Sequence, residues 1–79
     1  MKATLEKIKM IFENEVDPRV DVKSMDPDKS ISDQGVDSLD TSSIFLSIEE
    51  EYSINIKDED IERLDTLNKI VEFINSREK

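Results

Sequence analysis

The chain has 79 residues, 35% of them hydrophobic, and its 20 acidic and 11 basic side chains give a net charge of −9 at pH 7. These values predict one small domain over residues 1–79 that repels phosphate backbones, so we expect no nucleic acid partner. Cysteine and histidine are both absent, which excludes disulfides, thiol chemistry and histidine-based catalysis. No apolar run approaches the ~20 residues of a membrane span, and the N-terminal stretch lacks the apolar core of a secretion signal. We therefore expect a cytoplasmic protein.

Apolar residues at helical spacing predict a first helix that ends before Asp17-Pro18. They are Leu5, Ile8, Ile11, Phe12 and Val16. Residues 17–36 hold both prolines and the only glycine, so they predict a long loop. Four apolar residues can attach this loop to the core, namely Val20, Val22, Met25 and Ile31.

A second helix is predicted over about residues 38–52, followed by a connector at 54–57 and a short turn at about 58–63. The last helix should begin near Asp65-Thr66 as its cap and bury Leu67, Ile70, Val71 and Ile74. Strand signals are poor, because the chain lacks hairpin dipeptides and has few β-branched alternations. The fold class is therefore all-α: a small antiparallel four-helix bundle with three main helices, one short helix and a long first loop.

The second helix has two apolar faces. Its core face should contain Thr41, Ile44, Phe45, Ile48 and Tyr52. Leu39 and Leu46 lie roughly opposite, surrounded by Ser42, Ser43, Glu49 and Glu50. Two stacked leucines with acidic neighbours predict a docking surface for a partner with a basic patch. The alternatives are that the long loop folds over these leucines and that the acidic residues only keep the surface soluble.

Ser38 stands at the predicted start of the second helix. Asp37 can cap this helix, and Asp40 resembles the reciprocal partner of a capping box. A nucleophilic serine needs a neighbouring base, yet the chain has no histidine, and no lysine or arginine lies within eight residues of Ser38. An exposed, unactivated hydroxyl among acids is instead suited to modification by another enzyme that brings its own base and metal.

The run DQGVDSLDTSSIFLSIEEEYSINIKDEDIERLDTLNKIVEFI, residues 33–74, resembles the acyl carrier protein family. The first helix and loop match this family in length and pattern. The resemblance implies an antiparallel four-helix bundle whose serine, here Ser38, is esterified with 4′-phosphopantetheine from coenzyme A by a phosphopantetheinyl transferase (holo-synthase). Acyl groups would be held on this cofactor as thioesters for fatty-acid, polyketide or related biosynthesis, with the bundle interior sheltering the acyl chain.

The resemblance also implies a monomeric carrier without catalytic activity of its own. Its partners would be acyl- or aminoacyl-transferring enzymes with basic docking patches. The family's recognition face maps onto Asp37, Leu39, Asp40, Leu46, Glu49 and Glu50. Four of these residues, Leu39, Leu46, Glu49 and Glu50, are the ones that helical spacing alone places on the docking surface.

Several positions depart from the family's usual pattern. Gln34 stands where a leucine normally packs, and Ser30 stands where an aromatic is common, with Ile31 as its substitute. Ser42-Ser43 replaces Val-Glu, Lys57 replaces a frequent proline, and Ile54 replaces a usually polar residue. We therefore expect a specialised carrier, for a secondary pathway or for aminoacyl groups. The segment TLNKIVEFI is similar to D-alanyl carrier proteins.

Three other interpretations have to be weighed. Residues 26–37 place Asp26, Asp28, Ser30, Ser32 and Asp37 at EF-hand-like spacing. An EF-hand needs glycine at its sixth position and a bidentate glutamate at its twelfth, so we expect no dedicated metal site. A non-covalent acidic helical adaptor would keep its function when Ser38 is replaced by alanine. An enzyme is not expected, because the chain has neither histidine, cysteine nor a glycine-rich phosphate loop.

Overall fold

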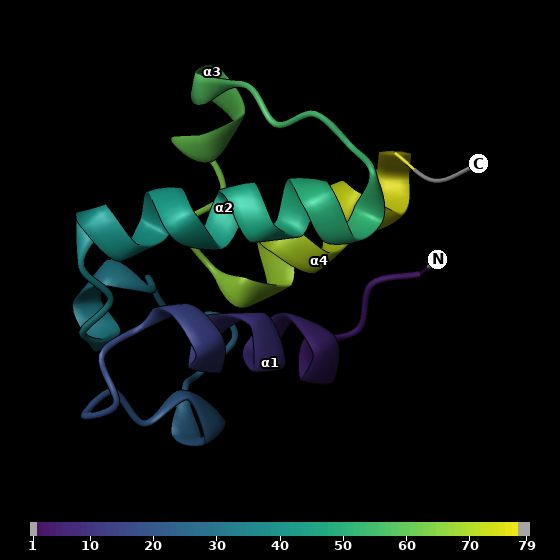
Figure 1. Cartoon of the computed structure of the whole chain (residues 1–79). Coiled ribbons are helices and arrows are strands. Elements are labelled where there is room, and N and C mark those ends of the chain that lie inside the picture. The colour runs from purple at the N-terminus through teal and green to yellow at the C-terminus, as the bar shows by residue number, and fades with distance from the viewer. Residues whose placement is uncertain (1, 78–79) are drawn as a thin grey trace.

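Four α-helices and two short 3₁₀-helices make up the secondary structure of residues 2–77, which the computed structural model describes (Figure 1). They are α1 (Leu5–Glu15), η1 (Val22–Ser24), η2 (Ser32–Gln34), α2 (Ser38–Tyr52), α3 (Asp58–Ile61) and α4 (Leu67–Arg77). The all-helical prediction is confirmed, and the predicted bounds of the second helix agree with α2. The loop over residues 17–36 contains the two 3₁₀-helices.

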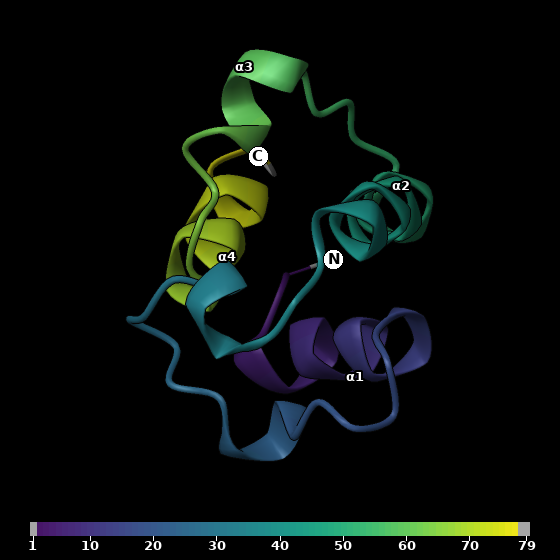
Figure 2. The same ribbon diagram turned by 90° about the vertical axis from the view of Figure 1, so that its left-hand side faces the viewer.

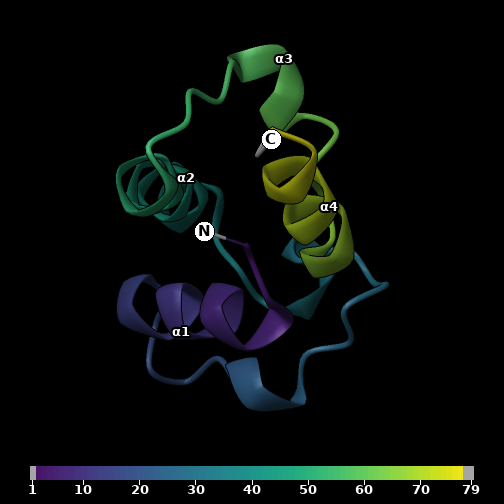
Figure 3. The same ribbon diagram turned by 90° about the vertical axis from the view of Figure 1, so that its right-hand side faces the viewer.

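The three long helices surround one core. α2 runs antiparallel to α1, and the end-on views show α1, α2 and α4 at the corners of a triangle (Figures 2 and 3). The short α3 lies on the side of this triangle away from α1, between α2 and α4. Arg77 of α4 reaches the carboxylate of Asp60 on α3 at 3.7 Å, which links these two helices.

The core is built from the apolar faces of the three long helices. Their largest fully buried side chains are Ile8, Phe12, Ile44, Phe45, Ile48, Leu67, Ile70 and Ile74. Tyr52 is also buried, so four of the five residues predicted for the core face of α2 are in the core. Thr41 is only half-buried, and its hydroxyl donates a hydrogen bond to the Asp37 carbonyl at 3.1 Å. Val71, which helical spacing predicts to be buried, is only half-buried at the edge of the core.

Threonine side chains cap α1 and α4. Thr4 Oγ1 accepts a hydrogen bond from the Lys7 N–H at 3.2 Å, and Thr66 Oγ1 accepts one from the Lys69 N–H at 3.1 Å. The sequence predicts that the last helix begins near Asp65-Thr66, and the residue that caps it is Thr66. Each bond satisfies a backbone donor of a first helical turn, which stabilises the helix by about 1 kcal/mol.

The side chain of Gln34 closes the loop that precedes α2. Its Oε1 accepts a hydrogen bond from the Asp26 N–H at 2.7 Å. Its Nε2 lies within hydrogen-bonding distance of the carbonyl oxygens of Asp26 (3.0 Å), Lys29 (3.2 Å) and Ser30 (3.4 Å). A leucine at this position could make none of these bonds. The loop therefore depends on polar contacts at the point where its sequence departs from the family pattern.

Further hydrogen bonds attach this loop to the start of α4. The Ile31 N–H donates to the Asp65 carbonyl at 2.8 Å, and the Asn68 N–H donates to the Pro27 carbonyl at 3.1 Å. Asn68 Nδ2 also donates to Asp28 Oδ1 at 2.6 Å. The buried side chains of Val22, Met25 and Ile31 complete the attachment, as predicted, whereas Val20 is partly buried.

The N-terminal segment contacts the last helix directly. The Ala3 N–H donates to Asn75 Oδ1 at 2.8 Å, and Asn75 Nδ2 donates to the Ala3 carbonyl at 3.2 Å. Ala3 is buried by this arrangement. Over the described range, the helices are too short or too polar to cross a lipid bilayer.

Candidate functional site

Ser38 is the first residue of α2, and its side chain is exposed. The turn before it uses Gly35, whose φ of 101° is a left-handed conformation that side-chain-bearing residues rarely adopt. The next residue, Val36, is buried, and its N–H donates to the Ile31 carbonyl at 3.2 Å. Together these features fix the chain where it enters α2, so the Ser38 hydroxyl lies at a defined place on the surface.

Asp37 caps α2, as predicted. Its Oδ1 accepts a hydrogen bond from the Leu39 N–H at 3.0 Å. A capping box requires the cap to bond to the N–H three residues on, here that of Asp40. Because Asp37 bonds to Leu39 instead, the box is not formed, and the described residues show no bond from the Asp40 carboxylate back to the Asp37 N–H. The Asp40 carboxylate therefore remains free for other contacts.

The Ser38 hydroxyl has no strong base beside it. Within residues 2–77, its hydrogen bond is to Asp37 Oδ1 at 3.4 Å, at the long end of the range for such bonds. A carboxylate in water is far too weak a base to deprotonate an alcohol. Serine catalysis by this chain alone is therefore not supported. The exposed hydroxyl can instead accept a group from an enzyme that provides the base.

The two leucines of the predicted recognition face are in solvent. Leu39 is 79% exposed and Leu46 is 57% exposed, so the long loop does not cover them. Glu50 is also exposed. The carboxylates of this face form no ion pair with another described residue. The ion pairs among the described residues involve three other carboxylates, those of Asp17, Asp60 and Asp65. The face therefore combines apolar area with uncompensated negative charge.

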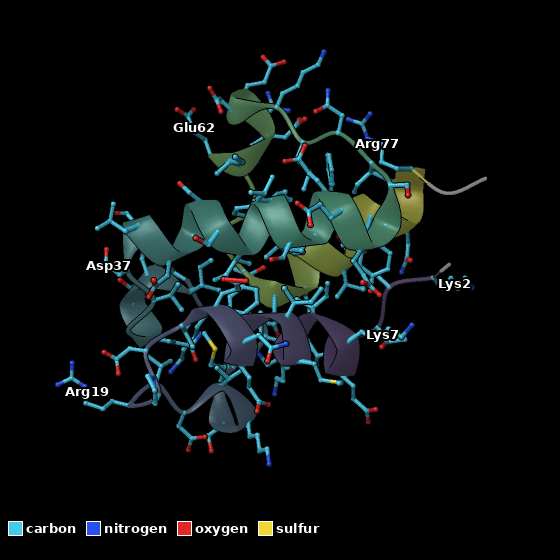
Figure 4. All side chains as sticks on the ribbon, in the orientation of Figure 1. Lys2, Lys7, Arg19, Asp37, Glu62 and Arg77 are labelled. Atoms are coloured by element: carbon cyan, nitrogen blue, oxygen red, sulfur yellow. The ribbon has the colours of Figure 1, made fainter. Side chains whose placement is uncertain are left out.

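The labelled basic side chains lie away from the start of α2, which agrees with the uncompensated negative charge there. In Figure 4, Asp37 lies at the loop end of α2, whereas Lys7 and Arg77 lie toward the opposite end of the molecule. Arg19 extends away from the helices, where its guanidinium binds Asp17 at 2.9 Å. None of these three labelled cations therefore lies over the start of α2.

Glu49 has a role that the sequence reading missed. It is half-buried, and its Oε2 accepts a hydrogen bond from the Ile56 N–H at 3.1 Å. This bond satisfies a backbone donor in the connector between α2 and α3. Helical spacing alone could not reveal it, because it depends on how the connector returns over α2.

Two of the carboxylates at EF-hand-like spacing, those of Asp26 and Asp28, are hydrogen-bonded within the protein. Asp26 Oδ1 accepts a hydrogen bond from the Asp28 N–H at 2.9 Å, and Asp28 binds Asn68. Ser30 and Ser32 bond to each other through their hydroxyls at 3.0 Å. Among the residues described, no group of three or more acidic side chains is arranged to hold a metal ion.

The interior among the long helices is filled by the fully buried side chains of the core. Three hollows on the described part of the molecule open on its outside instead. Because protein cores are packed as densely as organic crystals, an apolar chain could enter only by displacing core side chains. The sheltering of an acyl chain, which the family resemblance implies, would require such a displacement.

Comparison with known proteins gives one consistent match. The family model described as "Phosphopantetheine attachment site" matches residues 6–74. An acyl carrier protein of Buchnera aphidicola subsp. Acyrthosiphon pisum (strain 5A) is 36% identical over 77 residues, covering 98% of this chain and 95% of the relative. One from Buchnera aphidicola subsp. Schizaphis graminum (strain Sg) is 37% identical over 73 residues, covering 92% and 91% of the two chains.

Proposed function

The chain belongs to the acyl carrier protein family, and on this premise we propose that it holds acyl intermediates as thioesters on a 4′-phosphopantetheine arm attached to Ser38. It delivers them to partner enzymes of fatty-acid, polyketide or related biosynthesis and has no catalytic activity of its own. We expect it to act as a monomer in the cytoplasm. The observation that carries the proposal is the exposed, unactivated Ser38 hydroxyl at the start of α2.

The residues around Ser38 fit a phosphate-linked arm. The N-terminus of a 15-residue helix carries a partial positive charge, which favours a phosphate there. The exposed hydroxyl leaves room for a bulky substituent. The arm supplies the thiol that this cysteine-free chain lacks. Ser38 Oγ forms a phosphoester bond to the phosphopantetheine phosphorus as the phosphoanhydride bond of coenzyme A breaks. Adenosine 3′,5′-bisphosphate leaves, and the hydroxyl proton passes to a base of the phosphopantetheinyl transferase.

The recognition face suits the transferase and the later partners. Leu39 and Leu46 offer apolar area about two helical turns apart, with Asp40 and Glu50 close by on the same helix. A partner with a basic patch would gain both apolar contact and charge complementarity there. Asp37 contributes its negative charge while capping α2.

The decisive experiment is intact mass after incubation with coenzyme A, magnesium and a broad-specificity phosphopantetheinyl transferase. The wild type should gain the mass of one phosphopantetheine, and Ser38→Ala should gain none. Ser76→Ala, which removes an exposed serine on α4, is the matched control and should load as the wild type does. No mass gain on a folded wild type, with several transferases tried, would leave the non-covalent acidic adaptor as the better account.

For the cargo, we propose a specialised carrier, including an aminoacyl or D-alanyl type. The observation in favour is Gln34, whose hydrogen bonds hold the loop where the family's leucine packs. Complementation tests this: a specialised carrier should not restore growth to cells that lack their main acyl carrier. Growth with a normal lipid profile would contradict the proposal.

A further inference from the structure

A groove runs along the outside of the molecule between α1 and α2. Its larger part is a hollow of about 450 Å³. That hollow is lined by Ile11, Asn14, Glu15, Ser47, Glu50 and Glu51. A second hollow of about 230 Å³ shares Ile11, Asn14 and Glu51 and continues toward Met10 and Tyr52. We call the two together the α1–α2 groove.

The groove has an apolar part near Met10 and Ile11, and one hydrogen bond joins its two helices. Met10 is 63% exposed, and Ile11 beside it is only partly buried. Met10 is thus the one large exposed hydrophobic side chain on the described residues outside α2. Ser47 Oγ donates to Glu15 Oε1 at 3.0 Å, a bond that joins α2 to α1 across the groove. The groove therefore offers exposed apolar area beside a hydrogen bond that holds α1 and α2 together.

The walls of the groove are mainly negative. The lining of the two hollows includes three carboxylates, those of Glu15, Glu50 and Glu51, and one ammonium group, that of Lys7. These carboxylates make no ion pair with any residue of the described range 2–77. A purely apolar ligand would bury these carboxylates without pairing them, which is costly. A lysine or arginine suits the site better, because its stem packs on apolar surface while its charged end meets a carboxylate.

The groove adjoins the recognition face. Glu50 lines the groove, and it also lies one helical turn after Leu46 on α2. A partner that contacts Leu46 and Glu50 therefore reaches the groove without leaving the surface. This continuity gives α1 a part in binding that neither the sequence pattern nor the recognition face assigns to it.

We propose that the α1–α2 groove is a second docking surface for a protein partner that presents an amphipathic helix. A leucine-sized side chain of this helix packs against Met10 and Ile11, and its lysines or arginines pair with Glu50 and Glu51. The inference goes beyond attachment at Ser38 and relies on the proposed function only for the idea that partners dock on α2. Apo protein suffices to test it.

The probe is a synthetic amphipathic helical peptide with leucines on one face and lysines and arginines on the other. A second peptide of equal charge carries glutamines in place of the leucines. Backbone amide shifts of isotope-labelled apo protein are followed by NMR during titration. The leucine peptide should shift the amides of Ile11, Ser47 and Glu51. Shifts confined to the residues around Leu39 and Leu46, or equal binding of both peptides, would overturn the proposal.

Two variants locate the contact. Glu51→Lys should weaken binding of the leucine peptide by on the order of tenfold, because it removes one charge attraction and adds one repulsion. Glu59→Lys makes the same charge change on the exposed surface of α3 and should have a clearly smaller effect. Equal weakening by both variants would show that only the overall charge matters and would overturn the proposal that the peptide binds in the groove.

Met10→Ser tests the apolar contact. Because Met10 is largely exposed, this variant should fold normally, which a thermal melt will confirm. It should weaken the leucine peptide several-fold while leaving the glutamine peptide unaffected. An equal response of the two peptides would contradict the apolar contact. The mass assay on Ser38 is separate, so a failure of loading and a failure of groove binding are distinguishable.

Discussion

Gln34 exchanges two hydrogen bonds with the backbone of Asp26: its Oε1 accepts from the Asp26 N–H at 2.7 Å, and its Nε2 donates to the Asp26 carbonyl at 3.0 Å. One side chain thus closes the loop across eight positions of sequence. Because this loop leads into Gly35 and the start of α2, its order bears on the presentation of Ser38.

Gln34→Ala should lower the free energy of unfolding by about 1–3 kcal/mol, because it leaves loop donors and acceptors of a partly buried site without partners. Urea denaturation measures this. Gln34→Glu keeps the acceptor for Asp26 but loses the amide donor and sets a carboxylate against carbonyl oxygens, so it should also destabilise the protein. An unchanged urea midpoint in both variants would show that these bonds add nothing to stability.

Asp37 both caps α2 and carries a negative charge, and two variants separate the effects of these two properties. Asp37→Ala loses the bond to the Leu39 N–H and should cost about 1 kcal/mol of stability. Asp37→Asn keeps an acceptor and should retain the stability of the wild type, while phosphopantetheine loading slows because a negative charge is lost. Urea denaturation and loading rates by mass measure the two effects. A fully stable alanine variant would contradict the role of Asp37 as a cap.

Glu49 should respond to substitution as a structural residue. Glu49→Gln retains an oxygen that can accept from the Ile56 N–H, whereas Glu49→Ala leaves this donor without its partner. We expect the alanine variant to lose about 1–2 kcal/mol of stability and the glutamine variant much less. Glu50→Ala, at the exposed neighbouring position, serves as the control and should be close to neutral. Equal stability of the two alanine variants would refute this assignment.

Asp17 should titrate at unusually low pH. Hydrogen bonds from the Arg19 guanidinium, and then from the Arg19 N–H, lower the pKa of Asp17 from 3.8 to about 2. Since the folded-state pKa lies below the unfolded value, this contribution to stability is present above pH 3.8 and is lost as the pH falls through about 2. NMR titration of the carboxyl measures the midpoint. Arg19→Ala keeps the backbone bond, so the midpoint should return only part of the way to 3.8.

Salt should stabilise the fold. With a net charge of −9 on 79 residues, repulsion among carboxylates destabilises the folded state. About 0.1 M salt screens this repulsion at separations beyond ~10 Å. The exposed ion pairs lost to screening each contribute at most about 1 kcal/mol. The melting temperature should therefore rise between low and moderate sodium chloride, by about 4–8 °C for each kcal/mol gained. A constant or falling melting temperature would contradict this balance.

The features that sequence could predict are the local ones. Helical spacing and the Asp37 cap located α2, and Thr66 marked the start of α4. The exposure of Leu39 and Leu46 followed from the same spacing. These signals depend on neighbours within one or two turns of the chain, so they can be read without knowing the fold.

The features that sequence missed depend on distant partners. The polar Gln34 was recognised only as a departure from a pattern, because its bonds exist only once the loop has turned back on itself. The engagement of Glu49 by Ile56 and the groove between α1 and α2 likewise require the path of the chain in space. The half-burial of Val71 reflects its place at the edge of the core, which a helical wheel does not define.

The paired bonds between Ala3 and Asn75 join positions 72 residues apart. A ribosome makes the chain from its N-terminus, so Asn75, the partner of Ala3, is made 72 residues after Ala3. Until then α1 lacks α4, and the core side chains of Ile8 and Phe12 have only part of their packing surface. The core is therefore completed only after α4 has been made, and the net negative charge of the chain repels neighbouring copies until then.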